Sequence, residues 1–195
     1  MDQSTYYRDH WVSIEAERLD AYEGLFEWRP QLAPILDGAE LATGQSVVDY
    51  GCGPGSLSLE LARRVGPDGR VYGFDLNDEM IARAVGRAKR EAPDAPMTFS
   101  QVTDDAIPLD DASVDRVVCK NVLEYVTDVP IVLGQMRRVL RPGGKAHIID
   151  SDWGMLNVEP LGEERFKMLF DAAKLAYRTP NIGRKLYGFM RGAGF

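Results

Sequence analysis

Three alternating glycines are the chain's most distinctive chemical feature. They lie in VVDYGCGPGSLSLELA, residues 47–62, as Gly51, Gly53 and Gly55, two residues after Asp49. Glycine allows positive φ angles and lets the backbone approach a ligand closely. The apolar run before the turn and the amphipathic run after it predict a strand, a tight turn and a helix. Such a turn holds nucleotide-like ligands.

The spacing of these glycines distinguishes between classes of nucleotide-like ligand. The dinucleotide fingerprint is Gly-x-Gly-x-x-Gly, and counting from Gly51 or Gly53 places Ser56 or Ser58 at its last glycine. A phosphate-binding P-loop needs a lysine directly after the glycines, whereas the first basic residue here is Arg63. The turn therefore need not hold phosphate.

An acidic residue at the end of the next apolar run is a partner for the turn. Asp75 lies 20 residues after Gly55, and a carboxylate there can accept hydrogen bonds from both hydroxyls of a ribose. It would repel a 2′-phosphate, which disfavours an NADP-like ligand. A solvated acid at a strand end is the alternative, and the glycine turn at this spacing favours the ribose role.

Apolar runs and helical patterns alternate after Gln45. The predicted strands are SVVDY, RVYGFD, MTFSQV, VDRVVCK and KAHIID, and the predicted helices are 56–65, 78–91 and 128–140. This order predicts an α/β fold with a Rossmann-like, doubly wound, mainly parallel sheet and helices on both faces. Asn77 is predicted to cap the second of these helices.

Helical patterns also flank this core. One helix is predicted up to residue 26, and two more at about 161–177 and 180–191, the last with Thr179 as its cap. We expect a single domain over 1–195. Its parts are an N-terminal helical cap (1–44), a cofactor-binding core (45–150) and a C-terminal helical segment (151–195).

Composition narrows the class of protein. The 195 residues are 45% hydrophobic, which suits one domain, and the net charge of −7 without a basic stripe argues against a nucleic-acid partner. Cys52 and Cys119 are expected to be buried thiols of a reducing compartment. The two histidines form no ligand-spaced cluster, so no metal is expected. The polar start and the lack of a long apolar run predict a cytoplasmic protein without a membrane partner.

Four stretches together resemble class I S-adenosylmethionine-dependent methyltransferases. They are VVDYGCGPG, VYGFDLNDEMIARA, DDAIPLDDASVDRVVCKNVLEYV and RRVLRPGGKAHIID, in this order over about residues 47–150. The resemblance implies methyl transfer from S-adenosylmethionine to a small-molecule acceptor by in-line displacement, with S-adenosylhomocysteine as product. Two alternatives stay open. They are an NAD-dependent Rossmann oxidoreductase, which the glycine spacing and the RVLRPGG turn disfavour, and a non-catalytic S-adenosylmethionine-binding subunit.

The resemblance assigns cofactor-binding residues. The glycine turn approaches the methionine part of the cofactor, and Asp49 orients the site. Asp75 binds the ribose, and Leu76 packs on the adenine.

Two further assignments follow from the same resemblance. For the adenine amino group the alignment leaves Thr103 and Asp104 open, with Asp104 preferred. Asn121, at the end of the fourth strand, lines the chamber in which the methyl group is transferred.

Methyl transfer depends mainly on holding the acceptor in line, but a hydroxyl or ammonium acceptor also needs a base. His10 is a candidate base, in a helix that resembles the lid of related small-molecule enzymes. The alternative is that Tyr7 and Trp11 form a core stripe and His10 is a solvated neighbour. Tyr7 and Trp11 are predicted to bind substrate.

Ligands of α/β sheets bind outside the carboxyl ends of the strands, which points to further candidates there. Asn121, Tyr125 and Asp152 are candidate catalytic residues, and Tyr125 and Trp153 are candidate substrate-binding residues. Glu124 and Asp150 are expected at the same edge. A strand-end turn with one buried tryptophan is the alternative, and His147 is expected to be a satisfied residue within the sheet.

The end of the sheet departs from the family pattern. The usual C-terminal β-hairpin is expected to be missing, because the chain ends at MRGAGF, where the sixth strand would approach. The fifth strand would then expose an edge and apolar surface. We expect a second copy in a homodimer, or the C-terminal helices, to cover it.

Overall fold

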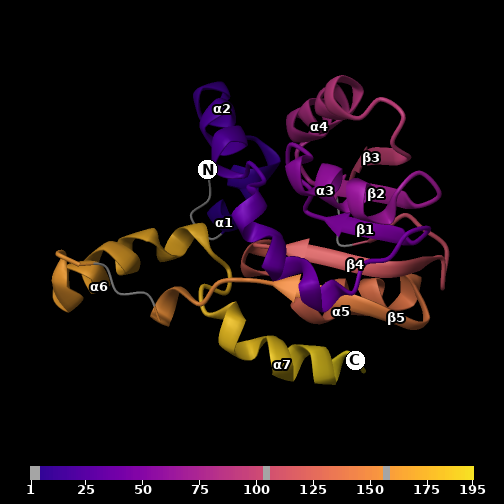
Figure 1. The fold of residues 1–195 in the computed structure, drawn as a ribbon. Helices are drawn as coiled ribbons and strands as arrows, with labels where there is room; N and C mark the ends of the chain where they lie inside the picture. The colour runs from indigo at the N-terminus through magenta and orange to yellow at the C-terminus, as the bar shows by residue number, and fades with distance from the viewer. Residues whose placement is uncertain (1–4, 103–105, 156–158) are drawn as a thin grey trace.

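Five strands form the centre of the computed structural model, which describes residues 5–102, 106–155 and 159–195 (Figure 1). The strands are β1 (Ser46–Tyr50), β2 (Arg70–Asp75), β3 (Met97–Gln101), β4 (Val114–Lys120) and β5 (Leu140–Ile149). Their order is β3-β2-β1-β4-β5, and all four pairings are parallel. The order changes direction between β1 and β4, so the crevice beyond their carboxyl ends is the switch point where such sheets bind ligands. The predicted parallel α/β sheet is confirmed.

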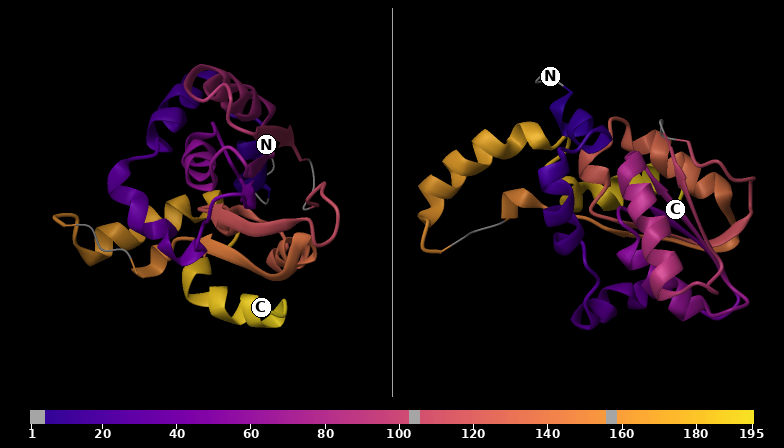
Figure 2. Two further views of the ribbon diagram at one scale, coloured as in Figure 1. Left: turned by 45° about the vertical axis from the view of Figure 1, so that its right-hand side comes forward. Right: turned by 90° about the horizontal axis from the view of Figure 1, so that it is seen from above.

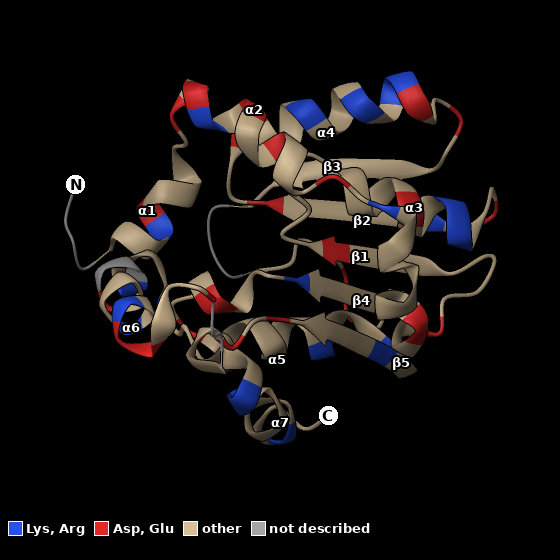
Figure 3. Ribbon diagram, turned by 60° about the vertical axis from the view of Figure 1, so that its left-hand side comes forward, with Lys and Arg blue, Asp and Glu red and all other residues tan. Residues whose placement is uncertain are grey.

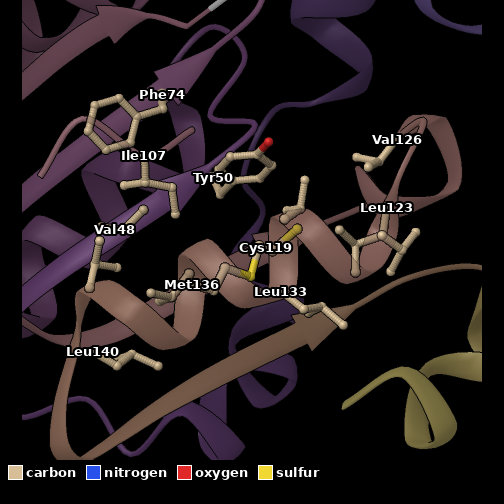
Figure 4. Packing of buried hydrophobic residues seen from close by; sticks show 14 of the residues in the cluster. Val48, Tyr50, Phe74, Ile107, Cys119, Leu123, Val126, Leu133, Met136 and Leu140 are labelled. Atoms are coloured by element: carbon tan, nitrogen blue, oxygen red, sulfur yellow. The ribbon is translucent and has the colours of Figure 1, made fainter. Parts of the chain in front are cut away.

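Helices cover both faces of this sheet. They include η1 (Pro30–Ala39), α3 (Ser56–Val65), α4 (Asp78–Glu91), α5 (Val129–Val139) and α7 (Ile182–Gly192). Val47 packs with η1 and α3 on one face, whereas its neighbour Val48 packs with α5 on the other (Figure 4). This alternation follows from the two-residue period of a strand. The sheet is therefore doubly wound, as predicted.

Local signals explain where the core helices begin. The Asn77 side chain accepts a hydrogen bond from the backbone N–H of Met80 at 2.8 Å, which confirms the predicted cap of α4. Asp128 caps α5 in the same way, accepting from Ile131, and Pro130 occupies its first turn. These caps satisfy N–H groups that have no partner within the helix.

The N-terminal cap is two helices, so the prediction of one helix was wrong. They are α1 (Tyr6–Val12) and α2 (Ala16–Leu25). The Asn77 amide donates to the backbone carbonyls of Trp11 and Val12 at 3.2 and 3.4 Å, which satisfies the end of α1. The chain then turns and buries Ile14 against Leu19 and Met80. Figure 3 shows both helices at the end of the sheet toward which the strand arrows point.

The C-terminal segment contains η3 (Trp153–Met155), α6 (Gly162–Ala173), η4 (Lys174–Ala176) and α7. Helix α6 extends away from the sheet (Figures 1 and 2). Helix α7 begins at Ile182 with Asn181 as its N-cap, so the predicted cap Thr179 was wrong. The N–H groups of Arg178 and Thr179 donate to the carbonyl of Glu124 at 2.9 and 3.0 Å.

Strand β5 is an edge strand among the described residues. Apolar side chains of α7, including Leu186 and Phe189, join the core cluster that Ala146 and Ile148 of β5 contact. The C-terminal helix therefore covers apolar surface of this strand, while the homodimer stays a hypothesis. His147 makes a 2.7 Å hydrogen bond through Nε2 to the carbonyl of Ile35, which confirms its role as a satisfied sheet residue.

Candidate functional site

A cavity of about 640 Å³ lies at the carboxyl ends of β1, β2 and β4, between the glycine turn and the helices of the cap. This volume is within the range of small-molecule sites. Ten predicted site residues line it: His10, Trp11, Asp49, Gly51, Gly53, Asp75, Leu76, Asn121, Tyr125 and Trp153. Three others, Tyr7, Gly55 and Asp152, are absent from its lining. Thr103 and Asp104 lie outside the described residues.

The three glycines of the turn have different roles. Gly51 has a φ of 75°, and a Cβ there would lie 2.2 Å from a methyl carbon of Val122. Gly55 is the N-cap of α3, and a Cβ there would lie 2.9 Å from the Cβ of Ala84 in α4. A Cβ on Gly53 would meet only Phe26 of the cavity wall, at 4.0 Å. The backbone of Gly53 therefore borders the cavity, whereas Gly55 allows α3 to pack closely against α4.

Asp75 joins the second strand to the glycine turn. Its Oδ2 accepts from the backbone N–H of Gly53 at 2.8 Å, and its Oδ1 accepts from that of Asn77 at 3.0 Å. Burial raises the pKa of this carboxyl group, and the two backbone hydrogen bonds oppose that effect. The side chain thus holds the turn in place while it faces the cavity.

Asp49 lies beneath the same turn and is 1% exposed. Its Oδ2 accepts from the Ser58 hydroxyl at 2.5 Å. The pKa of Asp49 is raised to about 7, mainly by burial and also by the nearby charge of Asp75, while the Ser58 hydrogen bond acts in the opposite direction. A buried and a half-buried carboxyl group beside a glycine turn suit a ligand that carries a positive charge and hydroxyl groups.

Asp150 organises the opposite wall. Its carboxylate accepts from the backbone N–H groups of Val122 and Leu123, at 3.3 and 2.8 Å. These bonds fix the start of η2 (Leu123–Tyr125), which carries two side chains of the cavity wall, Glu124 and Tyr125. Asp150 is therefore a positioning residue at the predicted functional edge.

Asn121 follows β4 directly and lines the cavity. It has a φ of 56°, a left-handed conformation that is uncommon for a non-glycine residue. Its amide donates to the Ser151 hydroxyl at 2.9 Å, which ties the end of β4 to the segment after β5. The residue is thus held in an unusual conformation at the centre of the cavity.

Aromatic rings from distant parts of the chain close the cavity. The ring centroid of Tyr125 lies 4.9 Å from that of Trp11 in α1 and 5.4 Å from that of Tyr177, on which it stacks. Trp153 lies 5.2 Å from Tyr177. The cap and the C-terminal segment therefore meet over the carboxyl ends of the strands.

His10 is buried in the cap, so the alternative of a solvated neighbour is wrong. Its Nε2 lies 2.7 Å from the Tyr22 hydroxyl, and the residue is 7% exposed. Burial lowers the pKa of His10, although Glu15 opposes this. The neutral imidazole faces the cavity with its ring nitrogen engaged by a tyrosine.

Two predicted acceptor-side residues point elsewhere. The Tyr7 hydroxyl lies 3.2 Å from that of Thr127 and attaches α1 to the loop before α5, whereas its neighbour Tyr6 lines the cavity. Asp152 pairs with Arg184 through two hydrogen bonds, at 2.5 and 2.9 Å. Neither arrangement supports the roles expected of Tyr7 and Asp152, which stay predictions.

Sequence reasoning gave no role to several residues of the wall. These are Tyr6, Tyr22, Phe26, Trp28 and Tyr177, whereas Glu124 lies at the edge where it was expected. In the sequence, the pattern of these aromatic residues is equally typical of a helix face packed in the core. Glu124 is only 1% exposed, and nothing in its local pattern signals that burial.

Two searches concern other kinds of site. Across residues 5–102, 106–155 and 159–195, no group of three or more His, Cys, Asp or Glu side chains is placed to hold a metal ion. In the same part of the chain, no helix is both long and apolar enough to cross a membrane.

Comparison with known proteins relates the chain to methyltransferases. Residues 41–182 match a methyltransferase domain family. The 2-phytyl-1,4-naphtoquinone methyltransferase of Trichormus variabilis is 37% identical over 140 residues, which are 72% of this chain and 56% of that protein. An uncharacterized 37.1 kDa protein in transposon TN4556 of Streptomyces fradiae is 34% identical over 186 residues, covering 94% and 53% respectively. The chain thus spans about half the length of these relatives.

Solved structures show the same fold. A phosphoethanolamine N-methyltransferase 2 of Haemonchus contortus in complex with S-adenosyl-L-methionine has a TM-score of 0.78 at 23% identity, covering 97% of this chain and 44% of that one. A SAM dependent methyltransferase from Aquifex aeolicus has a TM-score of 0.68 at 19% identity, covering 93% and 89%.

Proposed function

Because the chain belongs to the methyltransferase domain family, as its four motifs predict, we propose that it transfers a methyl group from S-adenosylmethionine to a small-molecule acceptor. The observation that carries this proposal is the cavity at the switch point, where the glycine turn, the buried Asp49 and the half-buried Asp75 face aromatic walls. The names of the curated relatives, which methylate quinone compounds, support a small-molecule acceptor.

The residues of the turn fit this cofactor. Asp75 uses one acceptor position on each oxygen for Gly53 and Asn77, and a carboxylate offers about four, so positions remain for ribose hydroxyls. The backbone of Gly51 and Gly53 would approach the amino-acid end, with Asp49 beneath them, and Leu76 would pack on the adenine. When bound, the cofactor supplies an electrophilic methyl group on a positively charged sulfur.

The aromatic walls of the cavity would position the acceptor. The rings of Trp11, Tyr125, Trp153 and Tyr177 would hold an acceptor near the methyl group and exclude water. Holding two reactants in the right geometry can lower a barrier by about 7–11 kcal/mol in favourable cases. Positioning is thus the main catalytic contribution that we assign to these side chains.

Calorimetry with three ligands tests the proposal. We expect S-adenosylmethionine and S-adenosylhomocysteine to bind and NAD not to bind. Binding of NAD alone would support the oxidoreductase alternative. Binding of S-adenosylmethionine without turnover of any member of an acceptor panel would support a non-catalytic subunit.

Asp75→Ala tests the assignment of the ribose site. We expect S-adenosylhomocysteine binding to weaken by about 1.5–3 kcal/mol, because hydrogen bonds to a charged group are lost. This corresponds to roughly 10- to 150-fold in Kd. Asp68→Ala, in an exposed turn, is the control and should leave Kd unchanged. An unaltered Kd in Asp75→Ala would remove this residue from the cofactor site.

A further inference from the structure

A buried carboxyl group lies on the acceptor side of the cavity. Glu124 lines the cavity although it is 1% exposed. The Trp153 indole N–H donates to its Oε2, and the side chains of Tyr125 and Asn121 also hydrogen-bond to it. No Lys or Arg of the described residues forms an ion pair with it. Because a carboxylate has about four acceptor positions, one remains for a ligand.

Aromatic rings line the cavity around Glu124. Tyr125 and Tyr177 stack on each other with an angle of 26° between their planes, and Trp153 packs beside Tyr177 at 36°. The Trp11 ring meets Tyr125 edge-on at 61° and continues this aromatic wall into the cap. A planar acceptor would pack against the side of this wall that borders the cavity, which Glu124 also lines.

The other titratable groups near these rings are poor bases. Burial and the neighbouring Glu124 raise the pKa of Tyr125, which keeps its hydroxyl protonated. The His10 imidazole is engaged by Tyr22, and Asp152 is held by Arg184. Glu124 is the group whose position and free acceptor site fit proton removal.

The environment of Glu124 sets the pH range in which its carboxyl group is ionised and can act as a base. Its pKa is raised to about 7, mainly by burial and also by the charge of Asp150 at the end of β5, while the hydrogen bonds act in the opposite direction. Tyr125 and Tyr177 are the other titratable groups against it. A base is most effective when its pKa lies near the working pH, because it can then both take up and release a proton.

We propose that Glu124 is the general base for methyl transfer to an aromatic hydroxyl compound of the phenol or hydroquinol class; this inference rests on the proposed function. The carboxylate removes the hydroxyl proton. The ionised oxygen, or the ring carbon beside it, bonds to the methyl carbon while the carbon–sulfur bond breaks and its electron pair stays on sulfur. If carbon is the nucleophile, the ring hydrogen at that carbon then leaves as a proton. Glu124 finally releases its own proton to solvent.

The test uses 1,4-naphthohydroquinone, kept reduced under anaerobic conditions, with S-adenosylmethionine, and detects the methylated product by mass spectrometry. For Glu124→Gln we expect kcat to fall by about 100-fold or more, while KM and the Kd of S-adenosylhomocysteine stay within about threefold. Glu124→Asp should retain an intermediate rate. Glu164→Gln, on the exposed surface of α6, is the matched control and should match the wild type.

Two readouts separate a base from a structural residue. The wild-type kcat should rise with pH through about 7, and this limb should disappear in Glu124→Gln. Methylation of the more acidic 4-nitrophenol should slow much less in the variant, because this compound ionises without a catalytic base. Equal rates of Glu124→Gln and wild type, or an unchanged limb, would overturn the assignment.

The remaining outcomes distinguish this inference from the proposed function. If the wild type binds S-adenosylhomocysteine but methylates neither hydroxyl compound, the acceptor class is wrong while the proposed function survives. If it binds neither S-adenosylmethionine nor S-adenosylhomocysteine, the proposed function itself fails.

Discussion

At the scale of single residues, Gly51 lies close against Val122 at the site, which leaves no room for a Cβ. Gly51→Ala should lower the free energy of unfolding by about 2–4 kcal/mol, because the new Cβ would overlap Val122 and the backbone has a positive φ. Urea unfolding measures this change. Adding Val122→Ala should recover the part that is due to overlap.

The helix glycine Gly134 is the control for that substitution. Nothing lies within 4 Å of the position of its Cβ, and it is exposed in α5. Gly134→Ala should therefore raise stability by up to about 1 kcal/mol, as alanine favours helix. A similar loss of stability at both positions would contradict the account of Gly51.

The site was predictable from sequence where a residue's role follows from the backbone. Asp49, Asp75 and Asn121 lie at strand ends, and strand ends of a parallel sheet meet at one edge. Tyr6 and Tyr7 could not be distinguished, because adjacent helix residues point in different directions and only tertiary contacts decide how a seven-residue helix is turned. The burial of Glu124 likewise depends on Trp153, which is distant in sequence.

At the scale of elements, charged side chains join the cap to the core. Acidic residues of α2 face basic residues of α4 (Figure 3). Arg87, whose side chain is 7% exposed, pairs with Glu23 and Glu27 at 3.1 and 2.8 Å, and Arg83 pairs with Asp20 at 2.7 Å. These contacts and Asn77 hold α1 and α2 over the cavity.

Arg87→Met should loosen the cap without unfolding the sheet. We expect the loss of these pairs to cost about 1–2 kcal/mol, between the values for exposed and for buried pairs. Hydrogen exchange of α2 amides should then be about 10-fold faster, with β1 unchanged.

Arg63→Met is the control for this change. Arg63 pairs with Glu60 on the surface of α3, and its side chain is 73% exposed. Its removal should alter α2 exchange very little. An Arg87→Met variant with normal α2 exchange would show that the ion pairs do not hold the cap.

The core elements were more predictable than the flanking ones. The strands and the helix over 56–65 follow from local apolar patterns and caps. The break between α1 and α2 depends on hydrogen bonds from Asn77, far along the chain, so local periodicity could not reveal it. The segment before α7 is also held by a distant group, because the N–H groups of Arg178 and Thr179 donate to the carbonyl of Glu124.

At the scale of the whole molecule, buried acids make stability depend on pH. Burial raises the pKa of Asp49 and of Glu124 to about 7, and it raises those of Asp75 and Asp150 as well. The folded protein therefore holds protons that the unfolded chain has lost above about pH 4–5. Their stabilising contribution is full below that range and is lost as the pH rises through 7.

Urea unfolding between pH 5 and pH 8 checks this expectation. The free energy of unfolding should fall as the pH rises, by up to about 3 kcal/mol for each of Asp49 and Glu124. Glu124→Gln should flatten the slope. Asp152→Asn should not, because Arg184 lowers the pKa of Asp152 and its contribution changes only below about pH 4. A flat wild-type profile would show that these acids are ionised in the fold.

The positions of the tryptophans allow ligand binding to be followed by the fluorescence of the protein itself. All three tryptophans of the chain, Trp11, Trp28 and Trp153, line the cavity, one each from α1, the segment before η1 and the segment after β5. Tryptophan fluorescence, excited selectively at about 295 nm or above, therefore originates entirely at the site. Binding of S-adenosylhomocysteine should change its intensity or emission maximum, and Trp153→Phe should reduce the part of the signal that comes from the acceptor wall. Ligand entry and cap movement can thus be timed by stopped flow without any attached dye.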